Sequence, residues 1–531
     1  MRAAVPLLLA VALAGCASAG NPVFVPSSAG PPPVQREFRG VWVAAVGNID
    51  WPSRPGLPTD SQKAELVRIL DRSKQLGLNV VILHVRPAGD ALYDSKLEPW
   101  SYFLTGEQGR APDPYYDPLA FAVEQAHQRG LELHAWFNPF RAKSPTQQTG
   151  YAPTHIARAH PEAVVPYGSF EWMDPGQDAV RKLSVDVVVD VARRYDVDGV
   201  HIDDYFYPYR ERGPDGTELD FPDSATYASY RAAGGTLGKS DWRRENVNRY
   251  VAEMYQAVKA VKPWVKVGIS PIGTWRPNVT PQLRGFDAYE SIFADTRKWL
   301  VDGDVDYFVP QLYWPIARTD VSFPVLLDWW VKQNVKGRGM YPGLGSGSVS
   351  FGRAGRGGWS PDEIIGQIYI TRGRPGAEGH VFFPMNSLMP NGAFRAVPGM
   401  DTLPPERIDS IRARQAAVQA LRDSLTAKLM NETYAQPALV PAEPWLGHHA
   451  PDAPHARLLN DVVTINAGNA RGVSLWVVQA RWSNGWHTDI VPIAQRQWTL
   501  TAPNGVTGGP SEVWVATVDR VGNMSKVVRA R

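Results

Sequence analysis

The stretch Asp198-Gly199-Val200-His201-Ile202-Asp203-Asp204-Tyr205 is a short apolar run that ends in two acidic residues. Because side chains alternate along a strand, Val200 and Ile202 share one face, and His201 and Asp203 share the other. The stretch therefore predicts a buried parallel strand, with Val200 and Ile202 against helices and Asp203 at the inner rim of a sheet. The alternative is that the two aspartates form a helix cap or a loop salt bridge. Because burying an unpaired charge is costly, two adjacent acidic residues at a buried strand end favour a functional role over this alternative.

Outward from this strand, short apolar runs alternate with helical patterns along the chain. The strand-like runs are 38–45, 79–85, 131–137, 197–202, 265–270, 306–312, 339–344 and 379–383. The helical patterns are 61–76, 117–130, 179–195, 242–261, 292–301, 325–335, 361–371 and 405–430. This alternation predicts an α/β fold, a (β/α)8 TIM barrel whose last helix closes it. A doubly wound open sheet is the alternative, but no glycine-rich phosphate turn follows the first strand.

In such a barrel the reactive groups lie at the carboxyl ends of the strands. Glycoside hydrolysis needs one carboxyl group as acid and another as nucleophile or base. We expect Asp203 to be the nucleophile or the stabiliser of positive charge, and Asp204, Glu290 and Asp90 are candidates for the acid. Further strand-end residues suit a sugar, because polar groups bind hydroxyls and aromatic faces stack on the ring. These expected substrate-binding residues are Trp42, Arg86, Asp90, His134, Trp136, Asn138, His201, Tyr205, Gln311, Tyr313 and Trp314.

Two other kinds of site remain open at this stage. His84, His134, His201 and Asp203 all project inward and could form the metal centre of a hydrolase or deacetylase, although no close histidine spacing marks one. A non-catalytic glycan-binding protein would keep the aromatic residues but would not need paired aspartates. No cofactor is expected. The net charge of +2 over 531 residues gives no indication of nucleic-acid binding.

The amino terminus predicts export and lipid anchoring. A basic start at Met1-Arg2 and an apolar run over 3–14 lead to Leu13-Ala14-Gly15-Cys16, which contains the only cysteine of the chain. This pattern resembles the bacterial lipobox, in which the cysteine is lipidated after cleavage. Ala17, and not an aspartate, occupies the next position, and the resemblance to the sorting rules of such lipoproteins implies the outer membrane. The sequence thus predicts an envelope lipoprotein on the periplasmic face, with its membrane anchor on Cys16.

The sequence pattern changes beyond Pro437, where β-like runs are no longer separated by helical patterns. The β-like runs 462–465, 475–482, 497–500 and 513–518 are separated by Asn-Gly and Gly-Asn turn signals. They predict a β-sandwich of about 90 residues, and the closing segment 515–523 resembles the last strands of fibronectin type III domains. The expected divisions are a signal peptide over 1–16, a tether over 17–36, the barrel over 37–435 and the sandwich over 437–531. The sandwich could bind glycan or an envelope partner, or act as a spacer.

Six blocks of sequence resemble one bacterial family, the glycosyl-hydrolase-like family ten (domain of unknown function 187). They begin at Phe38, Val85, His134, Asp198, Gly268 and Pro310. The resemblance implies a TIM barrel and hydrolysis of O-glycosyl bonds. The family includes a divisome-localised lipoprotein that cleaves peptidoglycan strands stripped of their peptides, which makes peptidoglycan strands the expected substrate and divisome proteins possible partners. Family members usually have two aspartates after a tyrosine where this chain has Tyr289-Glu290-Ser291, which weakens Glu290 as a candidate.

Overall fold

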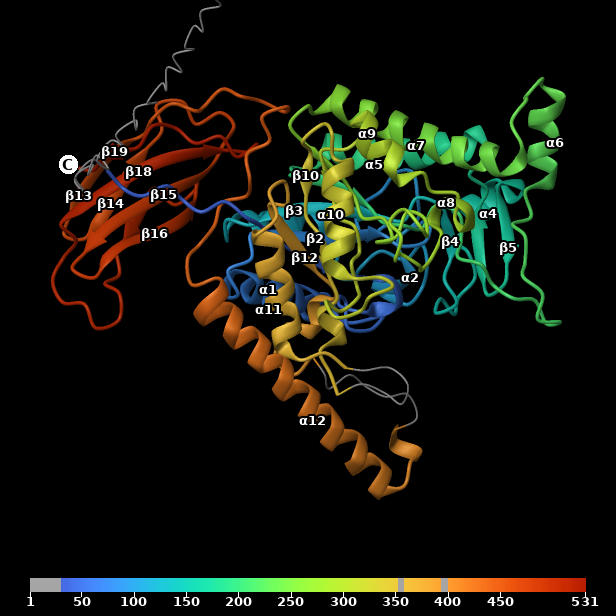
Figure 1. Ribbon diagram of the computed structural model, residues 1–531, viewed down its shortest axis with the longest axis horizontal. Helices are drawn as coiled ribbons and strands as arrows, with labels where there is room; N and C mark the ends of the chain where they lie inside the picture. The colour runs from blue at the N-terminus through green and yellow to red at the C-terminus, as the bar shows by residue number, and fades with distance from the viewer. Residues whose placement is uncertain (1–29, 352–357, 393–399) are drawn as a thin grey trace, which may run out of the picture.

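The computed structural model describes residues 30–351, 358–392 and 400–531. The predicted signal peptide, Cys16 and most of the predicted tether lie outside these ranges. Within the described ranges, no helix has both the length and the apolar character that a membrane span requires. Figure 1 shows a central barrel surrounded by helices, with the antiparallel strands of the carboxyl-terminal part at one end.

One parallel sheet runs around the barrel in the order β10-β9-β8-β7-β3-β2-β1-β12-β11. Its strands are β1 (Phe38–Val43), β2 (Val80–Arg86), β3 (Glu132–Phe137), β7 (Gly199–Ile202), β8 (Lys266–Ile269), β9 (Tyr307–Phe308), β10 (Gly339–Met340), β11 (Gly343–Leu344) and β12 (Gly379–Phe382). β10 pairs with β9, and β11, in the same extended run, pairs with β12. The run 339–344 therefore joins the two ends of the sheet, so the arrangement is a TIM-like parallel barrel and not an open doubly wound sheet.

The helices that follow these strands lie close to the predicted helical patterns. They are α1 (Thr59–Gln75), α3 (Pro118–His127), α5 (Asp178–Arg194), α7 (Lys239–Val261), α9 (Thr296–Asp302), α10 (Phe323–Gln333), α11 (Pro361–Arg372) and α12 (Pro405–Lys428). Local sequence sets their ends: the Asp117 side chain accepts hydrogen bonds from the first turn of α3, and α9 ends at Gly303 with a φ of 87°. Helix α12 meets the expectation only in part: its carboxyl-terminal half packs against α11 and the barrel core through Leu425 and the adjoining Leu429, whereas its first turns project from the barrel (Figure 1).

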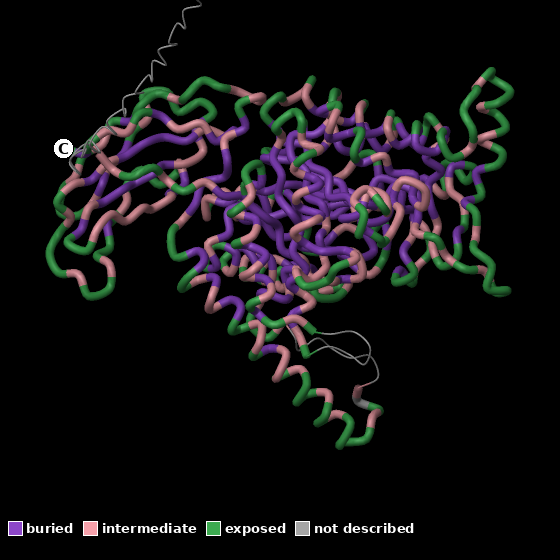
Figure 2. The backbone as a smooth tube through the Cα atoms, viewed as in Figure 1, coloured by how far each residue is buried: buried purple, intermediate pink, exposed green. Residues whose placement is uncertain are grey.

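Two apolar layers separate the two faces of each strand. Val41, Val200 and Ile202 belong to the layer between the strands and the helices, while Trp42 and Tyr307 fill the inside of the barrel. Figure 2 shows the strands as the most continuously buried part of the chain. The alternation predicted for the strand at 197–202 is therefore confirmed.

A small antiparallel sheet follows β3 and was not predicted. Its strands are β4 (Arg141–Lys143), β5 (Val164–Tyr167) and β6 (Phe170–Met173), in the order β4-β6-β5. A short helix, α4 (Ile156–Ala159), lies within this insertion, between β4 and β5, and three more lie in other loops: α2 (Tyr102–Thr105), α6 (Ser224–Ala232) and α8 (Ala288–Ser291). These insertions lie mainly at the carboxyl end of the barrel strands and shape the candidate site.

Two antiparallel sheets form the carboxyl-terminal part of the chain. One has the order β13-β14-β17, and the other has the order β16-β15-β18-β19. Their strands are β13 (His455–Leu459), β14 (Val462–Asn466), β15 (Val473–Trp482), β16 (Gly485–Pro492), β17 (Gln497–Thr499), β18 (Glu512–Asp519) and β19 (Val528–Arg529). Val463 and Ile465 of the first sheet share a buried core with Trp476 and Val515 of the second. The four predicted runs correspond to β14, β15, β17 and β18, whereas β13, β16 and β19 were missed.

The antiparallel sheets lie against the amino-terminal end of the barrel strands. Arg520 makes an ion pair with Asp196, two residues before Asp198, with a closest distance of 2.5 Å. The connecting segment also reaches this end, where the Trp445 indole N–H donates to the Asp306 carboxylate over 3.0 Å. The carboxyl ends of the strands, where reactive groups are expected, therefore lie at the opposite end of the barrel.

Candidate active site

A cleft of about 480 Å³ opens at the carboxyl end of the barrel strands. Seven of the predicted site residues line it: Trp42, Trp136, Asp203, Asp204, Tyr205, Gln311 and Tyr313. Residues that were not in the predicted set complete the lining, and the polar and aromatic ones are Arg141, Ser144, Thr146, Phe170, Tyr209, Ser270 and Phe383. The structure thus brings the two adjacent aspartates together with several aromatic rings.

Asp203 lies immediately beyond β7 and is only 4% exposed. Its carboxylate accepts hydrogen bonds from the Asn138 amide over 2.5 Å and from the Tyr205 backbone N–H over 3.2 Å. Arg141 donates to the other end of the Asn138 amide over 2.5 Å, which fixes the direction of that amide. Burial, together with the neighbouring charge of Asp204, raises the pKa of Asp203 to about 7, against the opposing effect of Arg141.

Asp204 is held by side chains from two other parts of the cleft. The Tyr209 hydroxyl donates to one carboxylate oxygen, and the Gln311 amide donates to the other over 3.0 Å. The same Gln311 amide donates to the Ser270 carbonyl over 2.9 Å. Burial raises the pKa of Asp204, and the hydrogen bonds from Tyr209 and Gln311 oppose that rise. Because the two carboxyl groups repel each other when both are ionised, the pair retains one proton near neutral pH.

Aromatic rings form much of the cleft wall. Tyr313 stacks on Phe383 with their ring centroids 6.0 Å apart. The Arg141 guanidinium lies 4.1 Å from the centre of the Tyr205 ring. Flat faces beside hydrogen-bonding carboxylates and amides are chemically suited to a sugar. The cleft therefore has the groups that both binding and hydrolysis of a glycan would use.

Asn138 and His201 lie under the cleft and do not line it. Asn138 holds Asp203, and His201 accepts a hydrogen bond from the Trp42 indole N–H over 3.2 Å. Arg86, also buried, makes an ion pair with Glu98 and donates to the Asn138 carbonyl over 2.6 Å. These residues support the cleft from below and are not placed to contact a substrate there.

Four predicted site residues lie elsewhere, and one of them, His134, lies beside Glu132 towards the opposite end of the barrel. Asp90 is fully buried in the loop after β2, where it accepts hydrogen bonds from Ala88, Tyr102 and Gln108, and burial raises its pKa to about 7. Glu290 lies on α8 beside a separate hollow, paired with Arg244 at 3.2 Å and with Arg276 at 3.7 Å. Trp314 packs against the core between the strands and the helices. The structure thus gives no support to Asp90 or Glu290 as the acid, or to Trp314 as a binding residue.

Of the three histidines considered for a metal centre, His134 and His201 have hydrogen-bond partners, whereas His84 makes a ring contact. The Tyr307 hydroxyl oxygen lies within hydrogen-bond distance of two of these rings, 2.7 Å from Nδ1 of His134 and 3.0 Å from Nδ1 of His201. His84 stacks on Trp136 with their ring centroids 3.9 Å apart. Among the described residues, no three histidine, cysteine or acidic side chains gather in a way that could hold a metal ion. The rings expected to share one ion are therefore distributed along the barrel core.

Some cleft residues could have been found from the sequence and others could not. Phe383 ends the predicted strand at 379–383, so the strand-end rule applies to it directly. Tyr209 follows Asp204 closely, in the run Tyr205-Phe206-Tyr207-Pro208-Tyr209. Phe170 and Thr146 belong to the insertion around β4–β6, whose short strands give no clear periodicity.

Comparison with known proteins identifies the family. The family described as Glycosyl hydrolase-like 10 matches residues 37–356. The chain is 39% identical over 426 residues to glycosyl hydrolase YngK of Bacillus subtilis (strain 168), covering 79% of this chain and 76% of the relative. It is 36% identical over 352 residues to glycosyl hydrolase DigH of Escherichia coli (strain K12), covering 61% and 78%.

Among solved structures, the glycoside hydrolase domain of PgaB (BpsB) from Bordetella bronchiseptica aligns with a TM-score of 0.44 and 16% identity, over 74% of this chain and 99% of that one. A TM-score of this size describes only a distant likeness. The family match, in contrast, covers more than half of the chain and confirms the resemblance seen in the six sequence blocks. The chain belongs to the glycosyl hydrolase-like 10 family.

Proposed function

We propose that this protein hydrolyses O-glycosidic bonds and that Asp203 and Asp204 are its catalytic pair. One observation supports this most strongly: two adjacent buried aspartates share an aromatic-walled cleft at the carboxyl end of β7. In a TIM-like barrel this end is where catalytic residues lie. Paired carboxyl groups with separated proton affinities are the groups that acid-assisted glycoside cleavage requires.

The hydrogen bonds suggest which carboxyl group has which task. Asp204 accepts from two neutral side-chain donors, Tyr209 and Gln311, and is the better stabilised carboxylate. Asp203, with its pKa raised to about 7, is the better proton donor. We therefore assign Asp203 as the acid that protonates the leaving oxygen, and Asp204 as the nucleophile, base or charge stabiliser. This reverses the order expected from the sequence.

The proposed substrate is a cell-envelope glycan, with peptidoglycan strands as the first candidate. Aromatic rings of the cleft would stack on the sugar rings, and Gln311 and Ser270 would bind hydroxyl groups. The predicted secretory signal and lipobox support a location in which such strands are accessible.

The activity can be tested on whole and amidase-treated bacterial sacculi, with released sugar fragments measured by chromatography. We expect wild-type protein to release fragments, and Asp203→Asn and Asp204→Asn each to lower the rate by at least about 100-fold. Glu290→Gln is the matched carboxyl-to-amide control outside the cleft and should retain the rate. Unchanged release by both aspartate variants would contradict the proposal, as would activity that is lost on chelation of metal ions.

The proposed anchor on Cys16 is tested separately. Cells expressing the full chain should incorporate labelled palmitate into the protein, which should fractionate with the outer membrane. Cys16→Ala should abolish both the incorporation of label and the fractionation with the membrane. The same substitution should leave the rate of hydrolysis by purified protein unchanged. Labelling that persists in Cys16→Ala would contradict the lipoprotein assignment.

The antiparallel sheets are proposed to be a fibronectin type III-like domain. Three strands in the order β13-β14-β17 face four in the order β16-β15-β18-β19, which suits a sandwich of that type. Because they pack at the amino-terminal end of the barrel, we propose that they bind an envelope partner or space the barrel from the membrane.

A further inference from the structure

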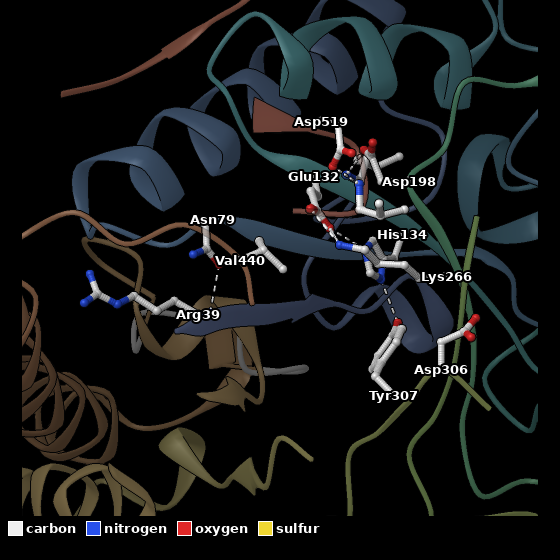
Figure 3. Close-up of polar contacts among 12 residues, drawn as sticks. Arg39, Asn79, Glu132, His134, Asp198, Lys266, Asp306, Tyr307, Val440 and Asp519 are labelled. Atoms are coloured by element: carbon white, nitrogen blue, oxygen red, sulfur yellow. Dashed lines mark hydrogen bonds and ion pairs between the residues drawn. The ribbon is translucent and has the colours of Figure 1, made fainter. Parts of the chain in front are cut away.

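A continuous series of hydrogen bonds, buried except at its far end where it is partly buried, runs through the barrel from the cleft to the opposite end. Part of it is visible in Figure 3, where Tyr307 points at His134 and His134 lies beside Glu132 and Lys266. The successive partners are Trp42 and His201 (3.2 Å), His201 and Tyr307 (3.0 Å), Tyr307 and His134 (2.7 Å), His134 and Glu132 (3.1 Å), and Glu132 and Lys266 (2.8 Å). Trp42, which begins the series, lines the cleft.

The geometry gives this series one direction. The Trp42 indole can only donate, so Nε2 of His201 must be an acceptor. Burial keeps the pKa of His201 well below its usual value, so the ring is neutral and its single proton is on Nδ1. That proton is donated to the Tyr307 oxygen, which leaves the Tyr307 hydroxyl to donate to Nδ1 of His134.

The other end of the series is fixed by a charge. Nε2 of His134 faces the Glu132 carboxylate, which can only accept, so this nitrogen carries the proton. Glu132 is in turn paired with the fully buried ammonium of Lys266. The ion pair at the amino-terminal end of the barrel therefore favours, through Tyr307, the same tautomer of His201 that the hydrogen bond from Trp42 favours from the other side.

The protonation of His201 has a consequence in the cleft. Ser270 lines the cleft, and its hydroxyl lies 2.9 Å from Nε2 of His201. Because Nε2 carries no proton, it cannot donate to Ser270; the Ser270 hydroxyl instead donates to it and shares the Nε2 lone pair with the Trp42 indole N–H, and the lone pairs of the Ser270 oxygen remain for the cleft. With the other tautomer, Nε2–H would donate to Ser270, the Trp42 indole would lose its acceptor, and the Ser270 hydrogen would be free to point at the substrate.

We propose that Tyr307 is a positioning residue: by holding His201 with its proton on Nδ1, it makes Ser270 a hydrogen-bond acceptor for a hydroxyl or amide N–H of the bound glycan. The role of Ser270 toward a glycan rests on the proposed function, whereas the tautomer of His201 does not. Tyr307 itself is fully buried and does not line the cleft.

The tautomer is measured first, on the full-length protein with ¹⁵N-labelled histidine. The His201 signals are assigned by their loss in His201→Gln, and the ¹⁵N shifts of the ring report which nitrogen is protonated. Wild-type protein should have the proton on Nδ1, and a wild-type His201 protonated on Nε2 would overturn the proposal without any variant of Tyr307. In Tyr307→Phe the Nδ1 proton loses its acceptor, so we expect His201 to change to the Nε2–H form or to a mixture.

Tyr341→Phe is the matched control. Tyr341 is another fully buried tyrosine inside the barrel, stacked on Phe38 with ring centroids 4.2 Å apart. Its hydroxyl has no hydrogen-bond partner among the described residues. Removing this hydroxyl should leave the His201 tautomer unchanged, and a tautomer change as large as that in Tyr307→Phe would show a general disturbance of the core and overturn the proposal.

Kinetics on amidase-treated sacculi test the connection to Ser270. Tyr307→Phe should lower kcat/KM by about tenfold, and Ser270→Ala by a similar factor. If Tyr307 acts through Ser270, the double variant should be little slower than Ser270→Ala alone. If the two substitutions instead lower kcat/KM independently, so that their separate factors multiply in the double variant, the proposal is overturned. If wild-type protein releases no fragments, the proposed function fails, while the histidine spectra still decide the positioning role of Tyr307.

Discussion

At the scale of single residues, the two aspartates differ more in their partners than in their burial. Asp203 and Asp204 are 4% and 6% exposed. Asp203 receives its side-chain hydrogen bond from Asn138, and Asp204 receives two, from Tyr209 and Gln311. Since hydrogen bonds to a carboxylate stabilise its ionised form, these contacts predict how the activity depends on pH.

We expect kcat/KM to fall at both acid and alkaline pH. It should fall as the pH rises through about 7, because Asp203 then loses the proton that it donates. It should also fall at acid pH, where Asp204 becomes protonated. In Tyr209→Phe the ionised form of Asp204 loses a hydrogen bond, so its pKa should rise and the acid limb should move up by about one pH unit.

Tyr195→Phe is the control for this profile. The Tyr195 hydroxyl donates to Asp117 over 2.6 Å, which is the same type of contact in a part of the molecule away from the cleft. Its profile should match that of wild type. An acid limb that stays in place in Tyr209→Phe would contradict the assignment of Asp204 as the ionised member of the pair.

At the scale of strands and helices, the sequence predicted the regular parts well. Short apolar runs placed β1, β2, β3 and β7, because a parallel strand that is buried on both faces is nearly continuously apolar. The alternation of side chains along a strand then identified the inward face of β7. Asp203 and Asp204 followed from that strand alone. The short strands β4, β5 and β6 were missed, since three or four residues give too little periodicity, and Phe170 was missed with them.

Where strand-end reasoning failed, the structure supplies a local cause. The pairing of β2 with β3 changes register between His84 and Arg86, so Arg86 does not continue the inward face and turns to Glu98. Glu290 lies on α8, well beyond the end of β8, where the direction of the chain is no longer set by the strand. Strand parity is therefore informative only for the residues next to a regular strand end.

At the scale of the whole molecule, the two ends of the barrel are specialised differently. One end holds the cleft, and the other is covered by the antiparallel sheets and the segment that leads to them. Glu443 in this segment is completely buried, and neither of its carboxylate oxygens has a hydrogen-bond partner among the described residues. Burial, with the nearby charges of Asp306 and Glu132, raises the pKa of Glu443 to about 8, against the opposing effect of Lys266.

The raised pKa of Glu443 predicts how the stability of the molecule depends on pH. In the unfolded chain a glutamate has a pKa of about 4.3, so between this value and about 8 the folded protein binds a proton that the unfolded chain does not. The free energy of unfolding should therefore decrease as the pH rises from about 5 to about 8. Glu443→Gln removes this titration. The Tm of the variant minus that of wild type should therefore increase as the pH rises from about 5 to about 8. The free energy of unfolding of wild-type protein should be lower at pH 8 than at pH 5 by roughly a few kcal/mol because of this one group.

The exposed Glu406 of α12 provides the control, since the Tm of Glu406→Gln should follow that of wild type at every pH. A Tm difference between Glu443→Gln and wild type that is constant from pH 5 to pH 8 would show that Glu443 is ionised in the folded protein.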